Sequence, residues 1–261
     1  MTSEPTITSP ILDVGTLDDA DAPPLVSILI AVRNEEQNIA PLVAEIEAAL
    51  AGVSREILFV DDGSTDGTSH ALSVAGSSVP NLRVTRHRIS CGKSAALVTG
   101  AQAARGFWIA TMDGDCQDDP RDIKALLSCA LNEEKRGAEP LLVAGHRINR
   151  RDTLIKRLSS RFANRLRARL LGDATPDTAC GLKLYRRAAF LALPHFDNMH
   201  RFLPALFIRA GGRVISVPVT NRPRLHGVSN YGTFDRAWAG LFDLIGVAWL
   251  QRRGKRPEVI E

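Results

Sequence analysis

A near-continuous apolar run, Leu25–Val32, constrains the fold more than any other feature of this sequence. A strand that is apolar at almost every position is typical of a parallel sheet with both faces covered. Strand and helix patterns then alternate with short connections over about the next hundred residues, which predicts a doubly wound α/β unit. Further strands are expected at 56–60, 82–85 and 107–111, and helices at 39–50, after Asp66 and at 94–104.

Polar clusters follow three of the predicted strands, and they begin at Arg33, Asp61 and Asp113. Each of the first two is also compatible with a turn or a helix cap, because Asp-Gly, Ser and Thr favour both. The carboxyl ends of parallel strands meet at one edge of a sheet, where α/β proteins bind their ligands. Three polar clusters at such an edge therefore predict a binding site.

The third cluster has the composition of a metal site. Asp113 and Asp115 leave the predicted strand two residues apart, and Gln117 adds an amide oxygen. Oxygen ligands suit a hard cation such as Mg²⁺ or Mn²⁺, whose open positions can take phosphate oxygens. The alternative is a solvated acidic loop that caps the helix beginning at Pro120. The first interpretation predicts a nucleotide diphosphate held through a metal ion.

Two common nucleotide motifs are absent. Gly92-Lys93-Ser94 matches the last three residues of a Walker phosphate loop. However, His87 lies five residues before Gly92, where that motif needs glycine. The dinucleotide fingerprint GxGxxG is also missing. The nucleotide is therefore expected to be neither bound by a Walker loop nor a dinucleotide.

The charge of the chain is unevenly distributed. The formal net charge is +4, but residues 1–24 hold five acids and no Lys or Arg, so the remainder carries 33 basic residues against 24 acidic ones. This excess suits an anionic ligand or an anionic membrane surface. The four cysteines have no CxxC spacing, so a zinc site is not expected. Their small number is consistent with a reduced, cytosolic setting, which is therefore expected. No signal-peptide pattern and no transmembrane run are predicted.

Three segments together resemble the signatures of inverting family-2 glycosyltransferases of the GT-A fold: 31–35, 60–68 and 113–120. The resemblance covers residues 25–232 or so, and the form Asp-x-Asp-x-Gln-x-x-Pro is similar to the dolichyl- and polyprenyl-phosphate branch. It implies a Rossmann-like, mixed but mostly parallel sheet flanked by helices. Ala31 departs from the pattern, which usually has Pro there, so the preferred base stays open.

The resemblance also implies roles for residues on the donor side. Asp113, Asp115 and Gln117 would hold Mg²⁺ or Mn²⁺, and Asp115 and Arg224 would act in catalysis. Asn230 replaces a lysine of the family's loop near Arg224, so one cation is lost. The residues expected to bind the nucleotide sugar are Ala31, Arg33, Glu35, Asp62, Lys93, Asp113, Gly114, Arg224 and Ser229, and the resemblance implies that Glu35 and Asp62 contact its nucleoside.

A basic stretch from Arg147 to Arg169 contains nine basic residues and one acid. Its apolar spacing predicts an amphipathic helix, and the alternatives are a solvated basic face or a nucleic-acid patch. Nucleic acid is not expected, because Phe162 alone could stack on a base. The resemblance implies that Arg147, with Lys156 or Arg157, binds an acceptor phosphate. It places Asp177 and Gly181 on the acceptor side.

These observations predict metal-dependent transfer of a sugar from a nucleotide-diphosphate sugar to a polyprenyl phosphate. The acceptor phosphate is already an anionic nucleophile, so a strong general base is not required. One alternative is the same fold acting on a saccharide or lipid hydroxyl, with Asp177 as the base. Another is a catalytically silent protein that binds nucleotide sugars or phospholipids.

The chain is expected to have three parts. Residues 1–24 form a disordered acidic tail, 25–232 the GT-A catalytic domain, and 233–261 an amphipathic interfacial helix with a basic tail. Such a helix would attach the protein peripherally to the cytoplasmic face of the membrane. The alternatives are a core helix packed on the catalytic domain, and recruitment by an integral membrane partner. The oligomeric state is left open.

Overall fold

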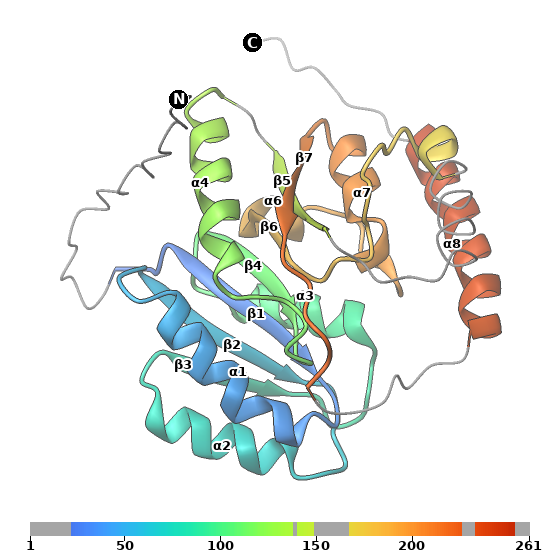
Figure 1. The fold of residues 1–261 in the computed structure, drawn as a ribbon. Helices are drawn as coiled ribbons and strands as arrows, with labels where there is room; N and C mark the ends of the chain where they lie inside the picture. Colours follow the sequence, from blue (N-terminus) through green and yellow to red (C-terminus); the bar gives the residue numbers. More distant parts are fainter. Residues whose placement is uncertain (1–21, 138–139, 149–166, 226–232, 254–261) are drawn as a thin grey trace, which may run out of the picture.

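A computed structural model describes residues 22–137, 140–148, 167–225 and 233–253 (Figure 1). Most of the expected acidic tail, the predicted site residues Lys156, Arg157 and Ser229, and the basic tail after Arg253 lie outside the described residues.

The described chain is built on a mixed sheet of seven strands in the order β3-β2-β1-β4-β6-β5-β7. Strands β1 to β4 pair in parallel, β6 runs antiparallel between β4 and β5, and β5 pairs in parallel with β7. The predicted mixed, mostly parallel sheet is therefore confirmed. The strands are β1 Val26–Val32, β2 Arg55–Asp61, β3 Leu82–Arg86, β4 Trp108–Asp113, β5 Leu141–Arg147, β6 Lys183–Arg186 and β7 Arg213–Val219.

Helices cover both faces of this sheet (Figure 1). Within β1, Ile28 and Ile30 pack into the core beneath α1, α2 and α4, whereas Leu29 packs into the core beneath α3, α6 and α7. Both cores explain why the run 25–32 is apolar at nearly every position. The helices are α1 Glu36–Ala49, α2 Thr68–Ser78, α3 Lys93–Ala103, α4 Asp122–Glu134, α6 Arg187–Leu191, the 3₁₀ helix η1 Met199–Arg201, α7 Leu203–Arg209 and α8 Thr233–Arg252.

The register of the central strands brings the polar clusters together. Ala31 of β1 pairs with Asp113 of β4, and Val32 pairs with Asp61 of β2. The three strands therefore end at the same level. The segments that follow them share one edge of the sheet, as predicted.

The C-terminal helix α8 packs against the second core. Its Leu244 and Val247 side chains are buried, and Gln251 Nε2 donates to the carbonyl oxygens of Leu171 and Ala205 at 2.9 and 3.2 Å. The predicted C-terminal helix is thus present and docked on the domain. None of the helices in the described ranges has the length and apolar character needed to cross a membrane.

Candidate active site

The first two polar clusters are tied to each other by side-chain caps. Asn34 has a positive φ of 56°, and its side-chain oxygen accepts from the Thr65 amide at 2.8 Å. The backbone amide of Asn34 donates to Ser64 Oγ at 3.0 Å, and the backbone amide of Glu35 donates to Thr68 Oγ1 at 2.9 Å. Turn and cap chemistry therefore accounts for much of these clusters. Glu35 remains at this edge, where its carboxylate accepts from Asn38 Nδ2 at 2.6 Å.

The predicted metal ligands are paired with cations. The Lys93 ammonium, at the start of α3, forms an ion pair with Asp113, and Arg224 donates to Asp115 Oδ2 at 2.7 Å. Burial and the neighbouring Asp113 charge raise the pKa of Asp115 above the usual range. The structure thus brings four predicted residues, from three distant segments, into one charged cluster.

Pairing between the two loops positions Arg224. The Arg222 amide donates to the Gln117 carbonyl at 2.9 Å, and Gln117 Nε2 donates to the Arg222 carbonyl at 3.4 Å. A single β-bridge joins Asp118 to Asn221. These contacts hold the chain that carries Arg224 across the acidic loop, so its guanidinium reaches Asp115.

The donor set of this cluster fits a hard divalent cation. Asp113, Asp115 and Gln117 offer oxygen atoms, and burial together with the Asp113 charge raises the pKa of the adjacent Asp118 to about 7. A cation bound between these carboxylates would relieve that repulsion. Gly181 faces the same carboxylate, since a Cβ there would lie 2.6 Å from Asp113 Oδ1. Only glycine leaves this approach to Asp113 open.

The remaining donor-side residues lie around this cluster. Ala31 is the β1 residue paired with Asp113, Gly114 is buried directly after β4, and Arg33 is exposed at the same edge. The predicted acceptor-side Gly181 lies against Asp113. A residue predicted to bind the donor, Lys93, and one predicted on the acceptor side, Gly181, therefore both lie against the Asp113 carboxylate.

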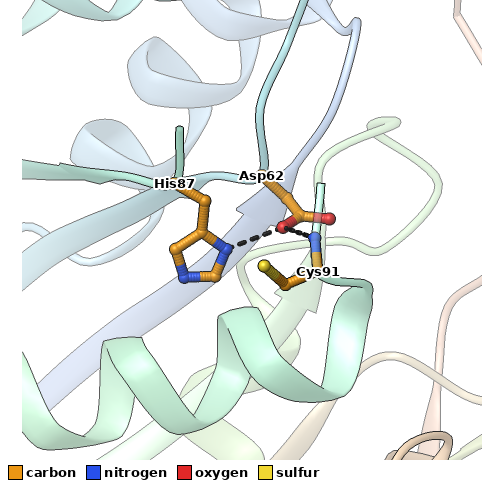
Figure 2. Close-up of side chains that lie close together, drawn as sticks. All are labelled: Asp62, His87 and Cys91. Carbon is orange, nitrogen blue, oxygen red and sulfur yellow. Dashed lines mark hydrogen bonds and ion pairs between the residues drawn. The ribbon is translucent and has the colours of Figure 1, made fainter. Parts of the chain in front are cut away.

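Asp62 binds the loop that precedes α3 (Figure 2). Its carboxylate accepts from His87 Nδ1 at 2.7 Å, Ser90 Oγ at 2.7 Å, and the amides of Cys91 and Gly92 at 2.8 and 2.9 Å. Burial opposes its ionisation, but these hydrogen bonds hold the pKa of Asp62 below the usual range. Asp62 therefore fixes the loop that ends at Lys93, in addition to its predicted contact with the nucleoside.

On the acceptor side, Arg147 and Asp177 face each other. Arg147 Nε and Nη2 donate to the two oxygens of Asp177 at 2.7 and 2.9 Å, and 17% and 4% of the two side chains are exposed. The resemblance implied an acceptor-side place for both residues. The structure joins them in a buried bidentate pair.

Sequence reasoning missed two groups beside the cluster. Lys183, buried in β6, donates to the carbonyl oxygens of Thr178 and Cys180. His200 Nδ1 lies 2.8 Å from Ser94 Oγ, and burial together with the charges of Lys93 and Lys183 lowers the pKa of His200 to about 3. The position of Lys183, two residues after the predicted acceptor-side Gly181, was the available signal for the first, and no sequence pattern marked the second.

The profile of the family described as Glycosyl transferase family 2 matches residues 27–193, which span every strand from β1 to β6. The chain belongs to glycosyl transferase family 2. The sequence-based family assignment, the glycosyltransferase class and the GT-A-like fold are thereby confirmed.

Curated relatives carry related names. A dodecaprenyl-phosphate galacturonate synthase of Rhizobium johnstonii is 36% identical over 249 residues, 93% of this chain and 72% of that protein. An undecaprenyl-phosphate 4-deoxy-4-formamido-L-arabinose transferase of Aeromonas hydrophila is 31% identical over 80% of this chain and 63% of its own length. The chain thus spans about two thirds of the length of these family-2 relatives. Both names agree with the branch that the motifs resembled.

Solved structures share the fold. Glucosyl-3-phosphoglycerate synthase of Mycobacterium tuberculosis, crystallised with Mn²⁺, UDP and glucosyl-3-phosphoglycerate, matches with a TM-score of 0.66 and 20% identity. The match covers 87% of this chain and 80% of that one. The same enzyme with Mg²⁺ and UDP also matches with a TM-score of 0.66. At this identity the likeness establishes the fold of the family-2 domain.

Proposed function

We propose that this family-2 glycosyltransferase moves a sugar from a nucleotide-diphosphate donor to a polyprenyl phosphate. The observation that carries the acceptor assignment is the Arg147–Asp177 pair, in which both carboxylate oxygens accept from one guanidinium. A carboxylate held in this way is a poor general base, so activation of a hydroxyl by Asp177 is disfavoured. A phosphate needs no such base, and guanidinium groups bind it in a bidentate, charge-assisted manner.

The acceptor phosphate would compete with Asp177 for Arg147. Asp177 then acts as a positioning residue, because it holds the guanidinium at the carboxyl end of β5 until the phosphate arrives. Arg167 belongs to the same region: its guanidinium lies 3.1 Å from Asp173 and donates to the Thr175 carbonyl at 2.6 Å. Lys156 and Arg157 lie outside the described residues and remain predicted phosphate ligands.

On the donor side, Lys93 and Arg224 would exchange their carboxylate contacts for contacts with the donor diphosphate. A divalent metal ion held by Asp113, Asp115 and Gln117 would supply positive charge to the leaving diphosphate. Lys93 and Arg224, now paired with Asp113 and Asp115, would then be free to donate to the diphosphate oxygens. Preorganised cations aimed at a developing negative charge lower the barrier to transfer.

The names of the curated relatives support the lipid acceptor, since both are transferases or synthases named for a prenyl phosphate. They differ in the sugar, so the sugar and the base of the donor stay open for this chain. Asp62 and Glu35 remain the predicted nucleoside contacts.

Helix α8 supports attachment to a membrane surface. Leu244 and Val247 pack on the domain, while 57% of Ile245 and 59% of Trp249 are exposed. The Arg253 guanidinium lies 5.8 Å from the Trp249 ring centroid, so aromatic and basic groups share the exposed side. This combination suits the interface of an anionic membrane. We therefore propose peripheral binding to the cytoplasmic face, with the domain limits predicted from the sequence.

The deciding experiment is transfer of label from radioactive nucleotide sugars to undecaprenyl phosphate or to undecaprenol. We expect labelled, organic-extractable product with undecaprenyl phosphate and none with undecaprenol. Equal product with the alcohol would support a hydroxyl acceptor instead. Nucleotide binding without turnover on either lipid would support a silent binding protein.

A further inference from the structure

Three side chains beside the donor site have the composition of a transition-metal site (Figure 2). Asp62 follows β2, His87 follows β3, and Cys91 lies on the loop before α3. One ligand atom from each lies within 4.8 Å of the others, and in the described part of the chain no other set of three His, Cys, Asp or Glu side chains meets this condition. Figure 2 shows the imidazole and the thiol on the same side of the carboxylate.

The three ligand atoms lie within 4.8 Å of one another, so side-chain movements are needed to reach the spacing around zinc. Zinc bonds of about 2.0–2.3 Å to oxygen, nitrogen and sulfur place neighbouring tetrahedral ligands about 3.3–3.7 Å apart. His87 Nδ1 and Asp62 Oδ1 are now 2.7 Å apart, joined by a hydrogen bond. They need to separate by less than ~1 Å to accept the ion between them.

The contacts around the three ligands suit both the metal-free and the metal-bound state. His87 Nε2 lies 2.9 Å from Thr99 Oγ1. When Nδ1–H donates to Asp62, the threonine hydroxyl can donate to Nε2. When a metal takes Nδ1, Nε2 carries the proton and the same hydroxyl accepts it. A second hydrogen bond of this kind is what orients a metal-binding histidine.

The carboxylate is oriented as well. Asp62 Oδ2 accepts from Ser90 Oγ and the Gly92 amide, and Oδ1 accepts from the Cys91 amide and faces His87 Nδ1. Gly63, at φ +66°, lets the loops approach closely, because a Cβ there would lie 2.6 Å from the Ser90 nitrogen. The loop that carries Cys91 is thus held against the end of β2.

We propose that Asp62, His87 and Cys91 bind Zn²⁺ or a similarly soft divalent cation, distinct from the hard cation at Asp113. The carboxylate and the thiolate balance its two positive charges, and the thiol proton is released to solvent. Exposed Cys91 leaves the fourth coordination position open to water.

This site has a consequence for catalysis that rests on the proposed function. Asp62 is the predicted nucleoside contact, so a metal ion and a nucleoside would exclude each other there. Zinc would then act as an inhibitor that competes with the donor.

The test is a titration of the metal-free full-length protein with Co²⁺ alone, followed by absorbance. A thiolate ligand gives cobalt an intense near-ultraviolet charge-transfer band that oxygen ligands do not give. We expect one equivalent to produce this band in the wild type and in Cys129→Ala, a half-buried cysteine on α4, and no band in Cys91→Ala. Absence of the band in the wild type, or its survival in Cys91→Ala, would overturn the site.

Two further measurements separate the parts of the proposal. Thr99→Val should keep the band but weaken Co²⁺ binding about 10- to 100-fold, as loss of an orienting contact does; unchanged affinity would refute the role of Thr99. Zn²⁺ should raise the donor KM of the wild type and not that of Cys91→Ala, and an equal rise in both would refute the competition. The cobalt band needs no donor, so it tests the metal site even if the proposed transfer reaction is wrong.

Discussion

Arg224 donates to Asp115 at 2.7 Å although 109 residues separate them in the sequence. Only 9% of the Asp115 side chain and 30% of the Arg224 side chain are exposed. The pair joins the acidic loop after β4 to the segment after β7. Together with the Lys93–Asp113 pair it balances the charge of the site, because each predicted metal ligand among the aspartates has a cation that a diphosphate could take.

Substitution of Asp115 tests the metal site. Asp115→Asn should leave the fold intact and reduce transfer by at least a hundredfold, because it removes an anionic ligand. Binding of Mn²⁺ in the presence of nucleotide, measured by calorimetry, should weaken in parallel, and EDTA should abolish wild-type activity. Asp119→Asn is the matched control, since Asp119 pairs with Arg121 at 2.6 Å instead of facing the cluster. Full activity of Asp115→Asn, or in EDTA, would contradict the metal assignment.

Arg224 is expected to act mainly in the transition state. Arg224→Ala should lower kcat about 10²- to 10³-fold, as loss of a preorganised charge-stabilising donor does, with a smaller effect on the donor KM. Arg121→Ala serves as the control, because this arginine is largely exposed and pairs with Asp119. Steady-state kinetics with both substrates would decide, and a change confined to KM would indicate ground-state binding instead.

The acceptor assignment can be tested at Arg147. Arg147→Ala should raise the KM for polyprenyl phosphate about 10- to 100-fold and leave the donor KM nearly unchanged, since a bidentate charged contact contributes ~1.5–3 kcal/mol. The single variant also removes the guanidinium that pairs with the buried Asp177 carboxylate, and breaking a buried ion pair can destabilise the fold by ~3–5 kcal/mol.

Arg147→Ala with Asp177→Asn removes that buried charge and should recover the melting temperature without recovering the acceptor KM. Asp177→Asn alone should retain most of kcat. A loss of several orders of magnitude in kcat for Asp177→Asn would instead identify Asp177 as a general base.

His200 predicts how stability depends on pH. Burial and nearby lysines lower its pKa from 6.5 to about 3 in the folded protein. Between these values the unfolded chain binds a proton that the folded chain does not, so stability falls as pH drops from 6.5 towards 3. The slope is at most about 1.4 kcal/mol per pH unit.

His200→Asn keeps a polar partner for Ser94 but does not titrate. Urea unfolding at several pH values should therefore show a shallower loss of stability for this variant than for the wild type. Identical slopes would show that His200 is protonated as easily in the folded state as in the unfolded one.

Membrane attachment can be tested on the exposed side of α8. The protein should sediment with anionic vesicles, and ~0.5 M salt should weaken this binding because it screens the basic groups. Trp249→Ser with Ile245→Ser should reduce sedimentation several-fold. Val74→Ser is the control, because Val74 is comparably exposed, at 55%, on the distant helix α2. If the full-length protein ignores anionic vesicles at low salt, recruitment must come from a membrane partner.

The sequence by itself determined strands β1 to β4, the helices between them and the edge that carries the site. Apolar runs and helical spacing are local patterns, and the carboxyl ends of parallel strands must meet at one edge. The polar clusters that begin at Arg33, Asp61 and Asp113 could therefore be placed near one another from the sequence. Motif resemblance added the family, because three short segments match it in order.

Only the tertiary structure decided which partners these residues have. The Arg147–Asp177 pair, the Arg224–Asp115 pair and the Asp62, His87 and Cys91 cluster each join segments 25 or more residues apart. Such contacts depend on strand register and loop packing, and no local periodicity records them. CxxC spacing does not bear on the proposed metal site, because Asp62 follows β2 whereas His87 and Cys91 share the loop between β3 and α3. Long-range packing sets the geometry of these charges, and that geometry distinguishes a general base from a residue that positions an arginine.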